Sequence, residues 1–282
     1  MRGLAYRMLG SISEAEDAVQ EVGLRWLRTD PAEIDNTEAW LISVTTRLCV
    51  DRLRSLSAER SAYQGWWLPE PIVTPAGSQP DAALDLSADL SIAFLTVLER
   101  LSPDERAVFV LREVFDCPFA SIATILGKTE ASCRQLGRRA RIRVRELRPR
   151  FEVSRDAHER LLGRFLTALQ DGDQSELLSL LSDDATLASD GGGKVKVSKA
   201  GIFGADRITR LIVHGRLVPR QLRQSPDRVA RRIVTINGEA GVITIVDGRL
   251  LSTLSISSDG TRIHQIHQVL NPDKLAHVTV PP

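Results

Sequence analysis

The sequence has few cysteines, few aromatic residues and no long apolar run. No stretch of 18 consecutive apolar residues occurs among the 282, which excludes a transmembrane helix. The first ten residues carry two arginines and none of the apolar length typical of a signal peptide. The three cysteines, Cys49, Cys117 and Cys133, form no CxxC pair, which argues against a disulfide framework or a cysteine-rich zinc site. These absences predict a protein of the reducing cytoplasm with no membrane contact.

What is present suits a globular protein with a localised charge. Hydrophobic residues make up 43% and charged residues 26% of the chain, enough to bury the cores of two domains. The formal net charge is only +1, yet residues 128–150 hold nine basic and two acidic side chains. A local basic stripe on a near-neutral chain indicates one anion-binding element.

The residue composition and the hydrophobic periodicity change along the chain. Residues 1–56 and 89–150 follow helical patterns, and the proline-containing segment 57–88 between them is typical of a linker. Residues 151–282 begin with helical patterns over 155–181 and continue in Val/Ile/Thr-rich runs at 231–237, 241–247, 250–257 and 261–269. Asn237-Gly238, Asp247-Gly248 and Asp259-Gly260 supply residues suited to tight turns with positive φ. The predicted fold is two all-α helical domains followed by an α+β domain.

The first domain is expected to contain a pair of helices. Residues 14–28 place apolar side chains at helical spacing and leave Asp17, Gln20, Glu21 and Leu24 largely outside that face. A second helix is expected over 38–56, with Thr37 as its N-cap. By periodicity alone, this is a helical hairpin with solvated charges.

The second domain carries a predicted helix-turn-helix. Ser102, followed by proline and Glu105, predicts a capping box at a helix start. A short helix opens at Pro118 and ends at Gly127, and Thr129 caps a helix over 130–147. That helix is expected to bury Cys133, Leu136, Ala140, Val144 and Leu147.

Arginines form a stripe on the last of these helices. Arg134, Arg138, Arg141, Arg145 and Arg148 repeat at spacings of four and three, with Gln135 and Arg139 beside them. Such a stripe repels itself unless a phosphate partner is present, so it favours DNA binding over a merely solvated face. The first turns of the helix would meet base edges in a major groove.

Three segments resemble the extracytoplasmic-function (ECF) sigma factors of the sigma-70 family. They are AYRMLGSISEAEDAVQEVGLRWL, DNTEAWLISVTTRLCVDRLRS and LSPDERAVFVLREVFDCPFASIATILGKTEASCRQLGRRAR, in that order. The resemblance implies a promoter-specificity subunit, with sigma region two at 1–56 and region four at 89–150. It implies contacts with core RNA polymerase through Asp17, Gln20, Glu21 and Leu24, with the −10 element through Asp35, Asn36, Trp40 and Arg47, and with the −35 element through Ser132, Arg134, Gln135, Arg138, Arg139 and Arg141.

Three further motifs are Trp67-Leu68-Pro69-Glu70-Pro71, Asp190-Gly191-Gly192-Gly193-Lys194 and Asn271-Pro272-Asp273-Lys274-Leu275. They are similar to motifs of the sigma factors with a fused SnoaL-like domain, a cone-shaped α+β barrel. In that subgroup the extra domain is thought to regulate the sigma core from within the chain, in place of a separate anti-sigma factor. The resemblance also implies about one more helix upstream of Met1, so the first helix is expected to be incomplete.

The linker carries an unusual apolar element. Trp66 and Trp67 are costly to leave in water, because each can bury about 200 Å². The ordinary interpretation is packing on the neighbouring helices, and the sharper one is docking on the C-terminal domain. A sigma factor needs this linker nearly extended to reach both promoter elements. We therefore expect docking of the 67–71 motif, with residues 190–194 and 271–275 as its clamp, to favour a compact state.

Two other functions fit parts of the sequence. A polymerase-independent repressor would have the helix-turn-helix but no use for a clamp-docking helix. A small-molecule enzyme or ligand sensor fused to a DNA-binding region would need a close Asp–His pair in a pocket, and the candidates are Asp190, His214, His264 and His267. His264 and His267 would point to opposite faces of a strand, and the glycine run lacks the spacing of a P-loop. The sequence thus predicts no catalytic residue, cofactor or metal, and leaves open an unidentified ligand in the C-terminal domain.

Overall fold

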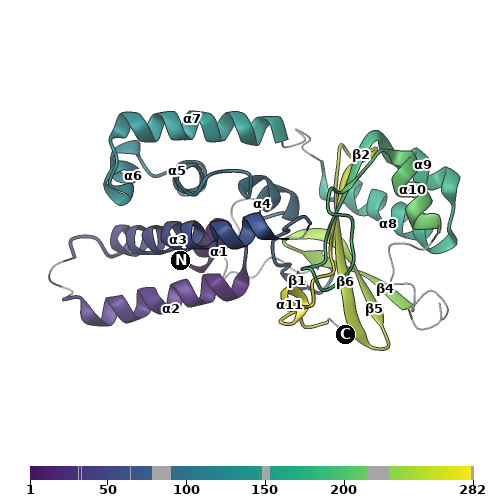
Figure 1. Cartoon of the computed structure of the whole chain (residues 1–282), viewed down its shortest axis with the longest axis horizontal. Coiled ribbons are helices and arrows are strands. Elements are labelled where there is room, and N and C mark those ends of the chain that lie inside the picture. The colour runs from purple at the N-terminus through teal and green to yellow at the C-terminus, as the bar shows by residue number, and fades with distance from the viewer. Residues whose placement is uncertain are drawn as a thin grey trace. The chain divides into compact units, whose positions relative to one another are not determined.

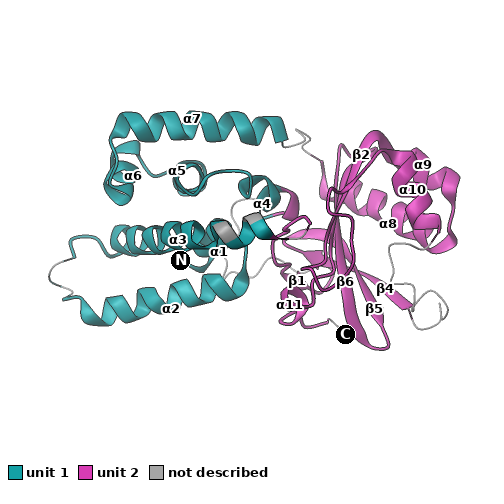
Figure 2. Cartoon of the chain, viewed as in Figure 1, with its two compact units in different colours: residues 1–62, 81–90, 94–148 teal, residues 63–80, 91–93, 149–282 magenta. Residues whose placement is uncertain are grey.

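The computed structural model describes residues 1–30, 32, 34–63, 65–77, 90–147, 153–214 and 229–280. The chain divides into two compact units: unit 1 is 1–62, 81–90 and 94–148, and unit 2 is 63–80, 91–93 and 149–282 (Figure 2). Part of the predicted linker and Arg148 lie outside the described residues. No helix in the described part of the chain is long and apolar enough to cross a bilayer.

Three helices open unit 1: α1 (Arg2–Leu9), α2 (Ile12–Arg28) and α3 (Thr37–Ala62) (Figure 1). The Ser11 hydroxyl caps α2 by accepting from the amide of Glu14. The helix expected over 38–56 extends to Ala62. Its N-terminal cap is Asn36, whose side chain accepts from the amide of Ala39 at 3.0 Å, so the prediction of Thr37 as the cap was wrong.

Four further helices are α4 (Ile92–Leu98), α5 (Pro103–Glu113), α6 (Phe119–Leu126) and α7 (Glu130–Leu147). The predicted capping box is present, with Ser102 and Glu105 bonded to each other's backbone. Gly127 ends α6 at φ 62° and leads into α7, so the predicted helix-turn-helix is confirmed. Four of the five expected core residues of α7 are buried, whereas Leu147 in its last turn is 41% exposed.

Unit 2 combines helices with a seven-stranded sheet of order β1-β4-β5-β6-β7-β2-β3. The helices are α8 (Arg155–Asp171), α9 (Gln174–Leu180), α10 (Ala205–Val213) and α11 (Pro272–Leu275). The strands are β1 (Val73–Thr74), β2 (Leu181–Asp190), β3 (Ile202–Phe203), β4 (Val229–Ile236), β5 (Glu239–Val246), β6 (Arg249–Ser258) and β7 (Ile263–Val269). The predicted fold class, all-α followed by α+β, is confirmed.

The hairpins of the sheet follow local turn chemistry. Asn237 and Asp247 have φ of 53° and 51° and each is followed by a glycine with positive φ, as predicted. In the third turn only Gly260 has positive φ. Strand β2 was not among the predicted runs, because LSDDATLASD has low strand propensity; its pairing with β7 and β3 makes it a strand.

The two faces of the sheet bury different partners. One face packs on α8, α9 and α10 around Phe165, Leu187 and Ile266. Residues an odd number of positions along a strand face the other way. Ala188, one residue after Leu187, and Val269, three residues after Ile266, form a separate cluster with Leu68 and Leu275. The second face of the sheet is therefore the one that receives the linker segment 63–77, within unit 2.

Candidate functional site

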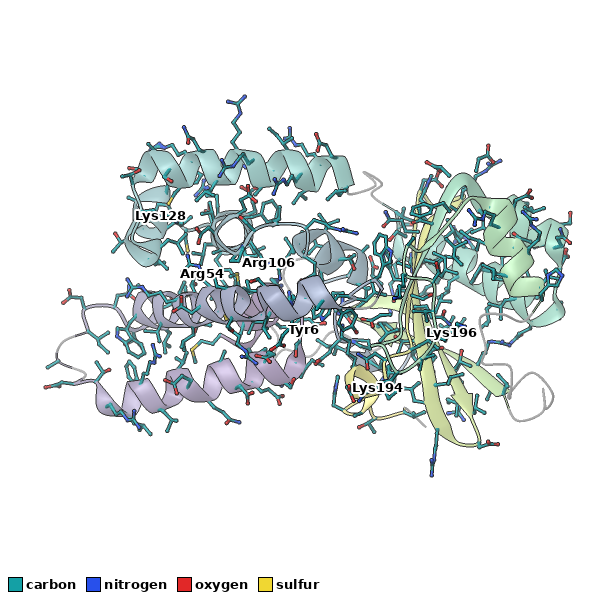
Figure 3. All side chains as sticks on the ribbon, in the orientation of Figure 1. Tyr6, Arg54, Arg106, Lys128, Lys194 and Lys196 are labelled. Carbon is teal, nitrogen blue, oxygen red and sulfur yellow. The ribbon has the colours of Figure 1, made fainter. Side chains whose placement is uncertain are left out.

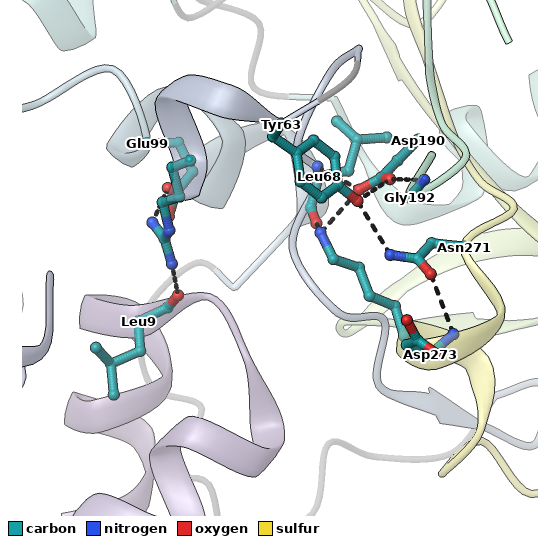
Figure 4. A network of polar contacts seen from close by, with 10 residues as sticks. Leu9, Tyr63, Leu68, Glu99, Asp190, Gly192, Asn271 and Asp273 are labelled. Carbon is teal, nitrogen blue, oxygen red and sulfur yellow. Dashed lines mark hydrogen bonds and ion pairs between the residues drawn. The ribbon is translucent and has the colours of Figure 1, made fainter. Parts of the chain in front are cut away.

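The linker segment of unit 2 is held by a buried polar cluster, which we call the linker clasp: Tyr63, Leu68, Asp190, Asn271 and Lys274 (Figure 4). Asp190 closes strand β2 and its side chain is 0% exposed. Its Oδ1 accepts from the Tyr63 hydroxyl at 2.5 Å, and its Oδ2 accepts from the Leu68 amide at 2.9 Å. One carboxylate thus contacts two points of the linker.

Lys274 completes the clasp from helix α11. Its ammonium donates to Asp190 Oδ2 at 2.8 Å and to the Leu68 carbonyl at 2.5 Å. Both peptide groups of Leu68 are therefore bound, one by the acid and one by the base. The ammonium also lies 3.7 Å from the centre of the Trp67 ring, a cation–π contact. Burying this ion pair is tolerable because further hydrogen bonds satisfy it.

Asn271 links the clasp to the cap of α11. Its Oδ1 accepts from the Asp273 amide at 3.1 Å, while its Nδ2 donates to the Tyr63 oxygen at 3.0 Å. Burial, followed by the hydrogen bond to Asp190, raises the pKa of Tyr63 above its usual value. The phenol therefore stays protonated and can donate to the carboxylate.

Neighbouring atoms lie so close to the backbone after Asp190 that two positions of the glycine run have no room for a side chain. A Cβ on Gly191 would lie 2.1 Å from the Val195 carbonyl oxygen, and one on Gly192 would lie 2.3 Å from the Asn271 side chain. The Gly192 amide also donates to Asp190 Oδ1 at 3.0 Å. The run shapes a loop around the clasp, and this geometry explains it better than a phosphate cradle does.

The rest of the linker motif is buried, and the chain then joins the sheet. Leu68, Pro69, Glu70 and Pro71 are all buried, and Trp67 is partly buried. Beyond them, Ile72 exchanges two hydrogen bonds with Asn237, and strand β1 pairs antiparallel with β4. Lys194 and Asp273 form an exposed ion pair at 2.6 Å. Tyr63 was missed by sequence reasoning because it stands in no recognisable motif, and Asn237 was identified only as a turn residue, not as a partner of the linker.

The residues weighed as catalytic do not come together. Asp190 serves the clasp, and His214 contacts the Arg210 carbonyl on α10. His264 contacts Asp259, which closes a turn through the amides of Thr261 and Arg262.

His267 differs from these candidates because it is buried with no hydrogen-bond partner for Nδ1 among the described residues. Burial lowers its pKa to about 4, so the imidazole is neutral at pH 7. Among the described residues, the hydrogen bonds of Asp190 join it to Tyr63, Leu68, Gly192 and Lys274, and the Asp–His contact between Asp259 and His264 belongs to a turn.

In unit 1, helix α2 presents the predicted polymerase-binding residues on one face. Asp17 and Gln20 are exposed, and Glu21 pairs with Arg25 at 2.9 Å. Leu24 is 49% exposed and Leu27, which sequence reasoning did not select, is 81% exposed. Two leucines are thus exposed on the same helix as the predicted polymerase-binding residues.

The residues predicted to meet the −10 element lie at and near the start of α3. Asp35 and Asn36 are exposed, and Asn36 is already the cap of the helix. Trp40 packs edge to face on Trp26, with the ring centres 5.4 Å apart. Arg47 points to the helix-turn-helix and donates to the carbonyls of Ile125 and Thr124 at 2.8 and 3.1 Å.

The predicted −35 residues on α7 differ in their partners. Arg139 pairs with the buried carboxylate of Glu105, as does Arg143, which was not among the predicted residues. Arg141 pairs with Glu113 at 2.8 Å, and Arg134 pairs with Glu130 and lies over the Phe119 ring. Arg138 and Gln135 are exposed, with no hydrogen bond or ion pair to the described residues, and Ser132 donates only its amide to the capping Thr129.

Further contacts join α1 and α3 to the segments around α5. Asp104 at the start of α5 pairs with Arg54 and with Lys128, residues labelled in Figure 3. Arg106 donates to the Met8 carbonyl at 2.6 Å and to Glu99 at 2.5 Å, and Arg60 pairs with the same glutamate. Unit 1 thus packs the first helices against the helix-turn-helix.

Comparison with known proteins identifies the two helical regions of unit 1. The family models Sigma-70 region 2 and Sigma-70, region 4 match residues 1–59 and 91–144. The chain is 38% identical to the ECF RNA polymerase sigma factor SigJ of Mycobacterium tuberculosis (strain H37Rv), over 97% of this chain and 89% of that protein. It is 34% identical to the probable ECF RNA polymerase sigma factor SigI of strain CDC 1551, over 96% and 90%.

A solved structure is similar over nearly the whole chain. The crystal structure of M. tuberculosis SigJ superposes with a TM-score of 0.77 at 35% identity, covering 97% of this chain and 94% of that one. Sequence identity and fold thus extend through both units. The chain belongs to the ECF RNA polymerase sigma factors of the sigma-70 family, in the group with a SnoaL-like C-terminal domain.

Proposed function

We propose that this sigma factor directs core RNA polymerase to promoters in the cytoplasm and that its C-terminal domain restrains it through the linker clasp. The clasp carries the proposal, because it binds both peptide groups of Leu68 with buried, charged side chains. A linker clasped at this point is not free to extend between two promoter elements. The C-terminal domain then acts in the place of a separate inhibitor.

Core polymerase would bind the exposed face of α2. Asp17, Gln20 and Glu21 supply its polar part, and Leu24 supplies exposed apolar area. We add Leu27 to this surface, because an 81% exposed leucine one turn from Leu24 extends the same apolar patch. Covering two leucines offers about 25 cal/mol for each Å² of apolar surface removed from water.

Promoter DNA would compete with contacts inside unit 1. The guanidinium of Arg47 donates to two carbonyls of α6, so it cannot contact −10 DNA in the same state. Ser132, Gln135 and Arg138, by contrast, lie in the first turns of α7 with no side-chain hydrogen bond to the described residues. We infer that −35 recognition begins with these residues and that −10 recognition follows release of Arg47.

Polymerase and DNA would open the clasp by binding the extended state more tightly than the clasped one. A ligand shifts such an equilibrium only by its differential affinity for the two states. A firmly clasped chain therefore needs either a strong promoter complex or a second signal. The C-terminal domain would then set how much binding free energy polymerase and DNA must supply before transcription begins.

The test is in vitro transcription with core polymerase and a promoter selected by this sigma factor. The full chain, an Asp190→Ala variant and a chain ending at Leu147 are compared, with Lys194→Met as the matched control. Lys194 belongs to the same motif as Asp190 but forms only an exposed pair. We expect more initiation from Asp190→Ala than from the parent and from Lys194→Met. Equal initiation from all three full-length proteins would contradict restraint by the clasp.

A further inference from the structure

A cationic cavity lies on the outer side of helix α10 in unit 2. Its volume is 460 Å³, within the range of pockets that hold small molecules. Its lining residues come from α10 and its C-cap, from β3 and from the loop before β3: Ser198, Gly201, Ile202, Arg207, Arg210, Leu211 and His214. Helix α10 buries Ile208, Thr209 and Ile212 toward the sheet core, so the cavity is outside the cone.

The charges of the cavity have few partners within the described residues. Arg207 has no hydrogen bond or ion pair there, and the Nε of Arg210 contacts only the Asp206 carbonyl at 3.3 Å. These residues lie three apart on the helix, so both guanidinium groups reach the same side. A guanidinium matches a carboxylate or phosphate group with paired hydrogen bonds. Ile202 and Leu211 add apolar wall to the same space.

The loop that forms one wall also supports the linker. The φ of Gly201 is +76°, and a Cβ built on it would lie 3.0 Å from Trp66 Nε1. A Cβ on Gly65 would lie 3.7 Å from Val197 Cγ2 and 3.9 Å from Lys199 Cα. The segment 197–202 therefore contacts the linker on one side and lines the cavity on the other. A molecule in the cavity would press on the surface that supports Trp66.

We propose that this cavity binds a small organic anion, a carboxylate or a phosphate monoester with a compact apolar body, and that its occupancy changes the docking of Trp66. The first part stands on the cavity alone. The second part rests on the proposed restraint of the linker. Arg207 and Arg210 would hold the anionic group, while Ile202 and Leu211 would contact the apolar body.

Calorimetric titration of the full chain tests the site with four probes. Benzoate and phenyl phosphate are the two organic anions, inorganic phosphate tests the head group alone, and benzamide is the neutral match for benzoate. We expect one organic anion to bind more tightly than inorganic phosphate and benzamide. Arg207→Gln should weaken that binding at least about tenfold. Arg160→Gln, an exposed arginine on α8, should leave it unchanged. No binding of either organic anion, or equal binding by the two variants, would overturn the site.

Fluorine NMR of the 5-fluorotryptophan-labelled chain tests the coupling. The four tryptophan resonances are assigned by single Trp→Phe substitutions. The bound anion should shift the Trp66 resonance and leave that of Trp26 in place. Binding that leaves Trp66 unmoved would overturn the coupling, whereas the transcription test of the clasp would stand unaffected. The same spectra show whether Arg207→Gln keeps the fold.

Discussion

The linker clasp of unit 2 and the ion pair between Arg54 of α3 and Asp104 of α5 in unit 1 differ in how deeply their charges are buried. The side chains of Asp190 and Lys274 are 0% and 7% exposed and are satisfied on several sides. Arg54 and Asp104 are 54% and 25% exposed. Exposed ion pairs contribute about 0–1 kcal/mol, whereas removing one partner of a buried pair costs about 3–5 kcal/mol.

This difference suggests an order of events on activation. Water and salt weaken exposed pairs, so we expect a charged partner to replace the contact of Arg54 with Asp104 at little cost. The clasp loses far more if it opens partly, because a lone buried charge remains. We therefore expect the clasp to open in an all-or-none manner and the exposed pair of Arg54 and Asp104 to respond gradually.

The largest expected effect comes from breaking the clasp on one side. Lys274→Met removes the cation and leaves the Asp190 carboxylate buried, which should lower the free energy of opening at the linker by about 3–5 kcal/mol. Hydrogen exchange at the Leu68 amide measures this directly, since that amide donates to Asp190. Lys194→Met is the control and should change it by less than about 1 kcal/mol. Equal protection in the two variants would show that the clasp does not hold the linker.

A second prediction uses His267, a buried residue of unit 2 whose Nδ1 has no hydrogen-bond partner in the part of the chain that the structure describes. The pKa of His267 is lowered to about 4 from 6.5, so the unfolded chain binds its proton first as the pH falls. Its contribution to stability is complete above pH 6.5 and is lost toward pH 4, by at most about 3 kcal/mol. Urea unfolding of unit 2, followed between pH 7 and 4, should show a shallower pH dependence in His267→Asn. An unchanged slope in His267→Asn would contradict this assignment.

A third prediction separates two arginines on one helix. Arg138 is exposed, whereas Arg143 pairs with buried Glu105. Arg138→Ala should cost about 1–3 kcal/mol of −35 binding and relax base preference, with thermal stability unchanged. Arg143→Ala should mainly lower thermal stability. Gel-shift titrations on matched and mutated −35 sites decide between them, and the reverse pattern would refute the proposed orientation of α7.

The smallest effect is expected in the exposed contacts of unit 1. Arg54→Ala removes the pair with Asp104, which Lys128 continues to neutralise. We expect a change below about 1 kcal/mol in the free energy of unfolding, and a further reduction of that change in high salt. A loss comparable to that of Lys274→Met would remove the distinction between the two regions.

Much of the helical part was predictable because its signals are local. The capping box of Ser102 and Glu105, the glycine after α6 and the apolar spacing of α7 each act within a few residues. The turns at Asn237 and Asp247 follow the same logic. The cap at Asn36 and the extension of α3 to Ala62 were missed, since neighbouring candidates of similar chemistry compete there.

The sequence by itself determined the order of the domains, the helix-turn-helix and the three motifs that identify the family group. Only the tertiary structure decided which residues those motifs contact, because the partners of Asp190 include Tyr63 and Leu68, 127 and 122 positions away. It also decided that Arg47 contacts α6, 78 residues further on. Caps and periodicity are short-range effects that a sequence displays directly. The cost of burying a charge depends on which distant group folding places beside it, and no local pattern records that.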